Sequence, residues 1–303
     1  MAKLRELILD LAVRGKLVEQ DENDEPGSEL LERVEVERTR LMKEGKLRKR
    51  KTPPSPSADE IPHDLPNGWV WTRLSIIGEI GPRNNIDDAT EVSFLPMATI
   101  SDGYAGTIEL EARTWGEIKK GFTPVADGDI AIAKITPCFQ NRKSAVMRGL
   151  KNGVGAGTTE LHVLSPIGGE IVPEYALLQL KSLTYLEVGV SKMTGSAGQK
   201  RVPKDYFADT AFPLPPLPEQ RRIVSKVDGL MSLCDELESR GSERVRLRDR
   251  ASRSCLGPLV SSRSRRDMAS AWQRLSDHFE VLYDIRASLM RISSRSSVTS
   301  CSS

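Results

Sequence analysis

The chain has 303 residues, and its 44 lysines and arginines nearly balance its 42 aspartates and glutamates, leaving a net charge of +2. This balance excludes a histone-like polycation, and the length suffices for one large domain or two modest ones. No apolar run approaches the roughly 20 residues of a membrane span, and the N-terminus has no signal-peptide pattern. The four cysteines form no CxxC pair, which favours neither a zinc site nor a disulfide framework. We therefore expect a reduced, cytoplasmic protein.

Residues 1–50 are predicted to form an N-terminal helical region. A helix is expected over residues 3–14, and Gly15 suits its end. Its apolar face is predicted to consist of Leu4, Leu7, Ile8 and Leu11. Ser28 can cap a second helix, in which apolar residues recur at helical spacing.

Residues 51–64 are predicted to be a linker, because their closely spaced prolines and serines disfavour regular structure. Residues 65–216 change character, with short alternating apolar runs between glycine, proline and aspartate clusters. This pattern predicts a compact α+β domain dominated by strands, with one helix at about residues 173–186. The expected strands lie at residues 92–100, 129–135, 144–147 and 160–164.

A proline-rich segment, Pro-Leu-Pro-Pro-Leu-Pro-Glu-Gln over residues 213–220, is the most distinctive local feature. Pro218 fits a first helical position, and Glu219 suits the positive end of the helix dipole. A long helix is predicted over residues 217–256, ended by Gly257 and Pro258. Its apolar residues alternate at spacings of four and three, which is typical of a coiled-coil seam. The predicted interface residues are Ile223, Val227, Leu230, Cys234 and Leu237.

The partner of this seam stays open at the level of sequence. The seam can dock on the chain's own core, on the N-terminal helix, on the same helix of a second subunit, or on both helices. Beyond it, residues 257–290 are predicted to form a short helical segment, which reads as a helical pair over residues 267–285. Residues 291–303 are over half serine, so a disordered tail is expected there.

Charged residues are distributed unevenly along the chain, although the net charge is small. Lys46 to Lys51 form a basic block, and residues 240–266 hold nine arginines against two acidic residues. Such patches suit an anionic partner, although a solvated face or a basic linker explains an isolated block equally well.

No motif for catalysis is found. A phosphate-binding GxxxxGK[ST] loop is absent, as are the motifs of an adenine methylase. The glycine cluster at residues 153–157 precedes a strand-like stretch, so a tight turn is predicted there and a cofactor loop is not. His63, His162 and His278 lie far apart and fit no metal or triad motif; each is interpreted as a surface or hydrogen-bonded core histidine. We predict no catalytic residue and no metal site.

Two polar loops, residues 134–143 and 191–201, are candidates for DNA contact. Arg and Lys can reach phosphates or guanine, and Gln and Asn can pair with adenine. The alternatives are an ordinary polar hairpin loop and, for Gln199, a role in holding its own loop. The candidate residues are Lys134, Thr136, Gln140, Asn141, Arg142, Lys143, Lys192, Thr194, Ser196, Gln199, Lys200 and Arg201.

Four segments in the same order resemble the specificity subunits of type I restriction-modification systems. They are residues 4–18 (LRELILDLAVRGKLV), 65–74 (LPNGWVWTRL), 195–200 (GSAGQK) and 213–224 with its PLPEQ motif. The resemblance implies a non-catalytic subunit whose target-recognition domain reads one half of a bipartite site in double-stranded DNA. It also implies a spacer helix that sets the distance to the other half-site and docks methyltransferase subunits. Those partners and the restriction subunits are expected to bring S-adenosylmethionine, ATP and magnesium.

Members of that family carry two recognition domains in tandem, whereas this sequence contains one and resembles a half-length form. Two copies then associate through their helices as a homodimer, or the chain is an inactive truncated remnant. A rival hypothesis from another class is a non-enzymatic coiled-coil assembly adaptor whose central domain binds protein.

Overall fold

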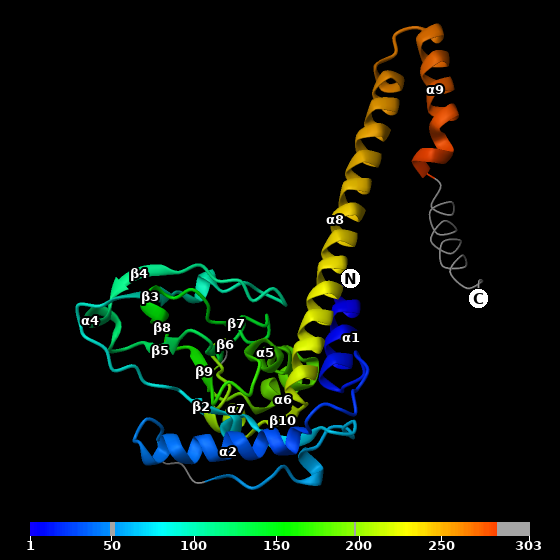
Figure 1. Ribbon diagram of the computed structural model, residues 1–303. Helices are drawn as coiled ribbons and strands as arrows, with labels where there is room; N and C mark the ends of the chain where they lie inside the picture. The colour runs from blue at the N-terminus through cyan, green and yellow to red at the C-terminus, as the bar shows by residue number, and fades with distance from the viewer. Residues whose placement is uncertain (49–51, 197, 284–303) are drawn as a thin grey trace. The chain divides into compact units, whose positions relative to one another are not determined.

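The computed structural model describes residues 1–48, 52–196 and 198–283 (Figure 1). These residues belong to two compact units, residues 1–232 and the residues from 233 onward. Within the described ranges, no helix is long and apolar enough to cross a membrane. Some predictions concern residues outside these ranges, among them the serine-rich tail at residues 291–303, the end of the helical segment at 257–290 and the last three residues of the basic block at 46–51.

The first unit is built around three small sheets. The first has the order β2 (Gly78–Ile80), β9 (Leu161–Pro166), β6 (Ile130–Ala133) and β7 (Ser144–Val146), and every pair in it is antiparallel. The second has the order β4 (Glu111–Thr114), β3 (Glu91–Leu95), β8 (Val154–Gly157) and β5 (Thr123–Ala126). In the third, β1 (Val70–Arg73) pairs antiparallel with β10 (Ala211–Leu214). The predicted α+β class is confirmed.

The predicted strands correspond to β3, β6, β7 and β9, because alternating apolar residues fill the space between the two larger sheets. That core includes Leu95, Ala131, Met147 and Val163, each at most 1% exposed. The run at residues 92–100 ends as a strand at Leu95 and continues into a short 3₁₀ turn. Short segments join the strands: α3 (Leu74–Ile77), α4 (Trp115–Ile118), α7 (Lys204–Asp209), η1 (Ala58–Glu60), η2 (Met97–Thr99) and η3 (Lys151–Gly153).

The single helix predicted at residues 173–186 is wrong, because two helices are present, α5 (Pro173–Lys181) and α6 (Leu183–Lys192). Ser182 separates them with an extended backbone, ψ 149°, and its Oγ accepts a hydrogen bond from the Tyr185 N–H at 3.3 Å. A serine N-cap therefore ends one helix and starts the next.

Helix α1 (Ala2–Val13) ends before Gly15, which has φ +65°, as predicted. Its predicted apolar face is right only in part, since Ile8 is buried whereas Leu4 and Leu7 are 42% and 52% exposed. The buried face is formed by Ile8, Leu9, Ala12 and Val13, and α1 packs against α5. Two overlapping apolar stripes exist on this helix, and the periodicity alone does not tell which one packs.

Helix α2 (Gly27–Lys43) begins after Pro26 and makes no side-chain cap hydrogen bond, so Ser28 is not its cap. Gly27 donates from its backbone N–H to the Gly68 carbonyl at 2.7 Å. A Cβ at Gly27 would lie 2.4 Å from the Leu214 carbonyl oxygen. The close approach of α2 to the end of β10 therefore fixes where the helix starts.

The glycine cluster at residues 153–157 forms a turn only at Gly153, which has φ +72°. Gly155 and Gly157 lie within β8, contrary to the predicted tight turn. A Cβ at Gly155 would lie 2.2 Å from the Ser93 carbonyl oxygen of β3. Glycine is required here because β8 and β3 pair as parallel strands at close range.

Helix α8 (Leu217–Ser261) continues through Gly257 and Pro258, beyond its predicted end. Pro258 removes one intrahelical hydrogen bond and its ring crowds the carbonyl four residues earlier, but the φ of proline suits a helix and the helix ends at Ser261, within one turn of Pro258. The Ser261 hydroxyl donates to the Gly257 carbonyl at 2.8 Å. The helical pair expected at residues 267–285 is replaced in the described residues by one helix, α9 (Arg265–Tyr283).

Two glycine-to-alanine changes should shift stability in opposite directions. Gly155→Ala should lower the free energy of unfolding by about 1–3 kcal/mol, because its methyl group overpacks against β3. Gly229→Ala should raise it by about 0.5–1 kcal/mol, because Gly229 lies on an exposed face of α8 with nothing within 4 Å of a Cβ. Denaturant unfolding of both variants measures this, and equal effects of one sign would contradict the packing of β8 on β3.

His162 predicts a pH dependence of stability. It is 9% exposed, its Nε2 lies 2.9 Å from the Val202 carbonyl, and its ring stacks on Phe207. Burial lowers the pKa of His162 to about 4 from its ordinary 6.5. Between these two pH values the unfolded chain binds the proton more tightly, so the His162 contribution to stability is lost as pH falls through that window.

The variant His162→Gln isolates this effect. It keeps an N–H donor for Val202 but cannot titrate, so its stability should fall less between pH 7 and pH 5 than that of the wild type. Urea unfolding at the two pH values gives the comparison. Parallel losses in both proteins would show that His162 does not control this part of the pH profile.

Candidate functional site

The first turn of α8 carries two buried polar side chains, Glu219 at 1% and Gln220 at 0% exposure. The Glu219 carboxylate accepts hydrogen bonds from the Trp69 indole N–H at 2.9 Å and from the Gln20 amide at 3.0 Å. Burial raises the pKa of Glu219, while these two donors oppose that change. The PLPEQ motif therefore fastens α8 to the loop after α1 and to the start of the central domain.

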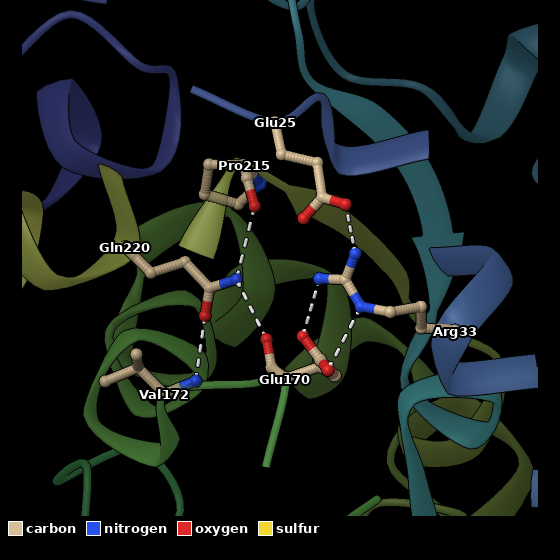
Figure 2. A network of polar contacts seen from close by, with 6 residues as sticks. All are labelled: Glu25, Arg33, Glu170, Val172, Pro215 and Gln220. Carbon is tan, nitrogen blue, oxygen red and sulfur yellow. Dashed lines mark hydrogen bonds and ion pairs between the residues drawn. The ribbon is translucent and has the colours of Figure 1, made fainter. Parts of the chain in front are cut away.

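Gln220 makes a second set of contacts, shown in Figure 2. Its Oε1 accepts from the Val172 N–H at 2.8 Å, and its amide donates to the Pro215 and Glu170 carbonyls at 3.2 and 3.4 Å. The Glu170 carboxylate in turn binds Arg33 of α2 through two hydrogen bonds of 2.8 and 3.1 Å. Arg33 also pairs with Glu25, so α2 and the loop before α5 are tied to the start of α8.

The two loops predicted to contact DNA lie against each other. Ile135 and Arg201 form an isolated antiparallel bridge. The Thr136 N–H donates to the Lys200 carbonyl at 3.0 Å, and the Val202 N–H donates to the Lys134 carbonyl at 2.8 Å. Residues about 65 positions apart in the chain are thereby joined into one polar surface through backbone hydrogen bonds, which fix loop geometry without depending on side chains.

Arg142 and Lys143 are engaged inside the unit. The Lys143 ammonium donates to the Ile100 carbonyl at 2.6 Å and forms an ion pair with Asp102 at 3.6 Å. Arg142 has φ +61°, and its guanidinium lies 4.9 Å from the centre of the Tyr104 ring. It donates to the Lys181 carbonyl at 3.2 Å and contacts Glu6 at 3.3 Å. These contacts give both residues a structural role in shaping the loop.

Lys134, Thr136 and Arg201 are also partly withdrawn from solvent. Arg201 binds the Glu160 carboxylate through two hydrogen bonds of 2.8 Å, which lower the pKa of Glu160. Burial lowers the pKa of Lys134. The Thr136 hydroxyl is buried and has no hydrogen-bond partner among the described residues.

The remaining candidates present their side chains to solvent. Exposed residues of the two loops are Gln140, Asn141, Lys192, Thr194, Ser196, Gln199 and Lys200. The Asn141 carbonyl accepts from the Gly103 N–H at 2.8 Å, while its side-chain amide lies 3.5 Å from Asp102. Three amide side chains and two lysines thus stand on loops that backbone hydrogen bonds hold together, an arrangement that suits base-edge and phosphate contacts.

The predicted seam of α8 is uneven. Ile223 and Val227, both within the first unit, are 0% and 2% exposed, so the chain's own first unit covers them. Leu230 is half-buried, Cys234 is 2% exposed and Leu237 is 57% exposed. The role of this seam in binding a second helix stays a prediction.

Sequence reasoning missed the anchor residues Gln20, Arg33 and Glu170. Trp69, Glu219 and Gln220 stood within recognised motifs, but no sequence signal pairs Trp69 with Glu219. Among the described residues, no cluster of histidine, cysteine and carboxylate side chains is arranged to hold a metal ion.

Comparison with known proteins gives a consistent result. Residues 66–246 match the family model of the type I restriction modification DNA specificity domain. The chain is 50% identical over 288 residues, 95% of its length, to the specificity subunits of the type I restriction enzymes EcoAI and EcoEI from Escherichia coli. It covers 49% and 48% of those proteins, so it spans about half the length of the curated relatives it matches.

The fold is also similar to a solved structure, the HsdS subunit from Thermoanaerobacter tengcongensis. The TM-score is 0.54 at 24% sequence identity, and the alignment covers 66% of this chain and 51% of that one. The matched residues 66–246 include both loops and the start of α8. The chain belongs to the type I restriction-modification DNA specificity family.

Proposed function

We propose that this chain is a sequence-specificity component of a type I restriction-modification complex and reads one half of a bipartite site in double-stranded DNA. The observation that carries the proposal is the convergence of loops 134–143 and 191–201 into one surface with exposed amides and lysines. Gln140 and Asn141 are assigned to base edges in the major groove. Lys192 and Lys200 are assigned to backbone phosphates, with Thr194, Ser196 and Gln199 beside them.

The internal contacts of Arg142 and Lys143 refine this assignment. A side chain that already donates to backbone carbonyls inside the unit must give up those hydrogen bonds to reach DNA. Arg142, Lys143 and the Glu160-paired Arg201 are therefore assigned to loop shape. The exposed residues then supply the direct contacts.

Helix α8 is assigned the role of spacer. Its first turn is fixed to the first unit by Glu219 and Gln220, so its direction at the elbow is set by buried hydrogen bonds. A fixed helix direction lets a helix–helix contact set the distance between two DNA half-sites. The exposed apolar residues Leu233, Leu237, Val245 and Leu247 favour burial against a partner helix.

Partners complete the proposed activity. Methyltransferase subunits dock on the helices, restriction subunits join them, and these partners use S-adenosylmethionine, ATP and magnesium in the cytoplasm. This chain contributes recognition and no catalytic group. Two copies that pair through α8 would read an inverted repeat, because a two-fold dimer presents the same surface twice.

The double variant Gln140→Ala, Asn141→Ala tests the loop assignment. Each lost bidentate amide–base pair should lower discrimination against the wrong base by roughly 1–3 kcal/mol. Affinity for random duplex should stay nearly unchanged, since phosphate contacts remain. Binding of the chain with its methyltransferase subunit to a preferred and a random duplex, followed by fluorescence anisotropy, gives both values.

The matched control is Gln273→Ala, which removes an exposed amide from α9. It should leave the ratio of the two affinities unchanged. An unchanged ratio in the loop variant as well would refute the assignment of bases to Gln140 and Asn141. A wild type with no preference for any duplex would refute the proposed function itself.

A further inference from the structure

A second group of basic residues lies in the first unit, outside the two loops. It lines a cavity of about 350 Å³ formed by α2 and the residues after it, α3, β2 and the start of α7. The charged residues at this cavity are Arg38, Arg48, Lys204, Glu79 and Asp205. Arg48 belongs to the basic block 46–51, for which the loop surface offers no role.

The positive charges act on one half-buried carboxyl. Burial raises the pKa of Glu79, whereas Arg48, Arg83 and Lys204 lower it through their charges. All three cations are therefore close enough to Glu79 to interact electrostatically. Arg48 and Lys204 are exposed at the surface, so they can exchange water for an anionic ligand at little cost.

An independent feature of the same cavity is the hydroxyl of Ser75. Ser75 is 3% exposed, lines the cavity, and its Oγ has no hydrogen-bond partner among the described residues. A buried hydroxyl without a partner costs free energy. A ligand oxygen in the cavity would accept this hydrogen bond.

The cavity adjoins the loop surface. Lys204 follows loop 191–201 by only a few residues, and its charge reaches both Lys134 and His162. Lys134 joins loop 134–143 to loop 191–201 through its backbone. An extended polyanion lying on the loops would therefore pass close to Lys204.

We propose that this cavity binds one phosphodiester group of the DNA backbone next to the half-site, with Arg48 and Lys204 as cationic donors and Ser75 as the hydroxyl donor. The inference rests on the proposed function and extends it. Contacts to phosphate fix the position of the protein on the duplex but carry no sequence information. Arg48, the residue of the basic block 46–51 that lines the cavity, thereby gains a function in DNA positioning.

The double variant Arg48→Gln, Lys204→Gln tests the inference in the full chain with its methyltransferase subunit. Loss of one phosphate contact makes the negative slope of log K against log salt concentration less steep by about 0.9. A rise from 50 to 200 mM salt should therefore weaken the variant about 3.5-fold less than the wild type. Preferred and random duplex should lose affinity equally, so their ratio should not change.

Two further variants separate binding from folding. Ser75→Ala should weaken DNA binding without lowering the free energy of unfolding, because it removes a hydroxyl that has no partner in the protein. Lys120→Gln is the matched control, since Lys120 is exposed and follows α4, which Figure 1 shows well apart from α7. It should leave the salt slope at its wild-type value.

The outcomes distinguish the two proposals. A wild type that binds no duplex with preference overturns the proposed function. If the wild type does prefer one duplex, but the Arg48→Gln, Lys204→Gln variant has the same salt slope as the wild type, this inference alone is overturned. Thermal stabilisation of the wild type by inorganic phosphate, lost in the variant while the DNA salt slope stays unchanged, would assign the cavity to free phosphate and also overturn it.

Discussion

The burial of Glu219 and Gln220 is the constraint on which the first unit depends. A buried carboxylate or amide is costly unless its hydrogen bonds are made. Here the partners come from three distant segments: Gln20 after α1, Trp69 before β1, and the chain from Glu170 to Val172 before α5. Each segment makes at least one hydrogen bond to the first turn of α8. The elbow is thus specified by polar contacts, with apolar packing from Ile223 and Val227 behind it.

The same constraint connects the elbow to the DNA-reading surface. β1 pairs with β10, so the two ends of the central domain meet directly before α8. In the chain, α5 and α6 lead to loop 191–201, and backbone hydrogen bonds join this loop to loop 134–143. The proposed recognition surface is therefore part of the same compact unit as the start of the spacer helix. A spacer can transmit a defined distance only when both of these parts are fixed to one body.

Much of the fold could be predicted from the sequence. Alternating apolar residues gave β3, β6, β7 and β9, and Pro218 with Glu219 gave the start of α8. Only Ile8 of the buried face of α1 was predicted, because the stripe through Leu4 and Leu7 is as apolar as the stripe through Leu9. The break at Ser182 was missed because a serine within an apolar helix pattern acts as a cap only when a backbone N–H of the following turn donates to its Oγ, as that of Tyr185 does.

The candidate site divides in a similar way. The two loops were found from their composition, because polar and basic side chains between strands are visible in a sequence. The inward direction of Arg142 and Lys143 was not visible, since it follows from the positive φ of Arg142 and from carbonyl groups about 40 residues away in the chain, at Lys181 and Ile100. The cavity at Ser75 was missed because its lining comes from four separate segments.

The most direct test of the account is selection of binding sites from a random duplex library by the chain together with its methyltransferase subunit. The account predicts strong enrichment of one short sequence, arranged as an inverted repeat at constant spacing if two copies pair through α8. A bound pool with the same composition as the starting library would contradict the central claim that the paired loops read DNA sequence.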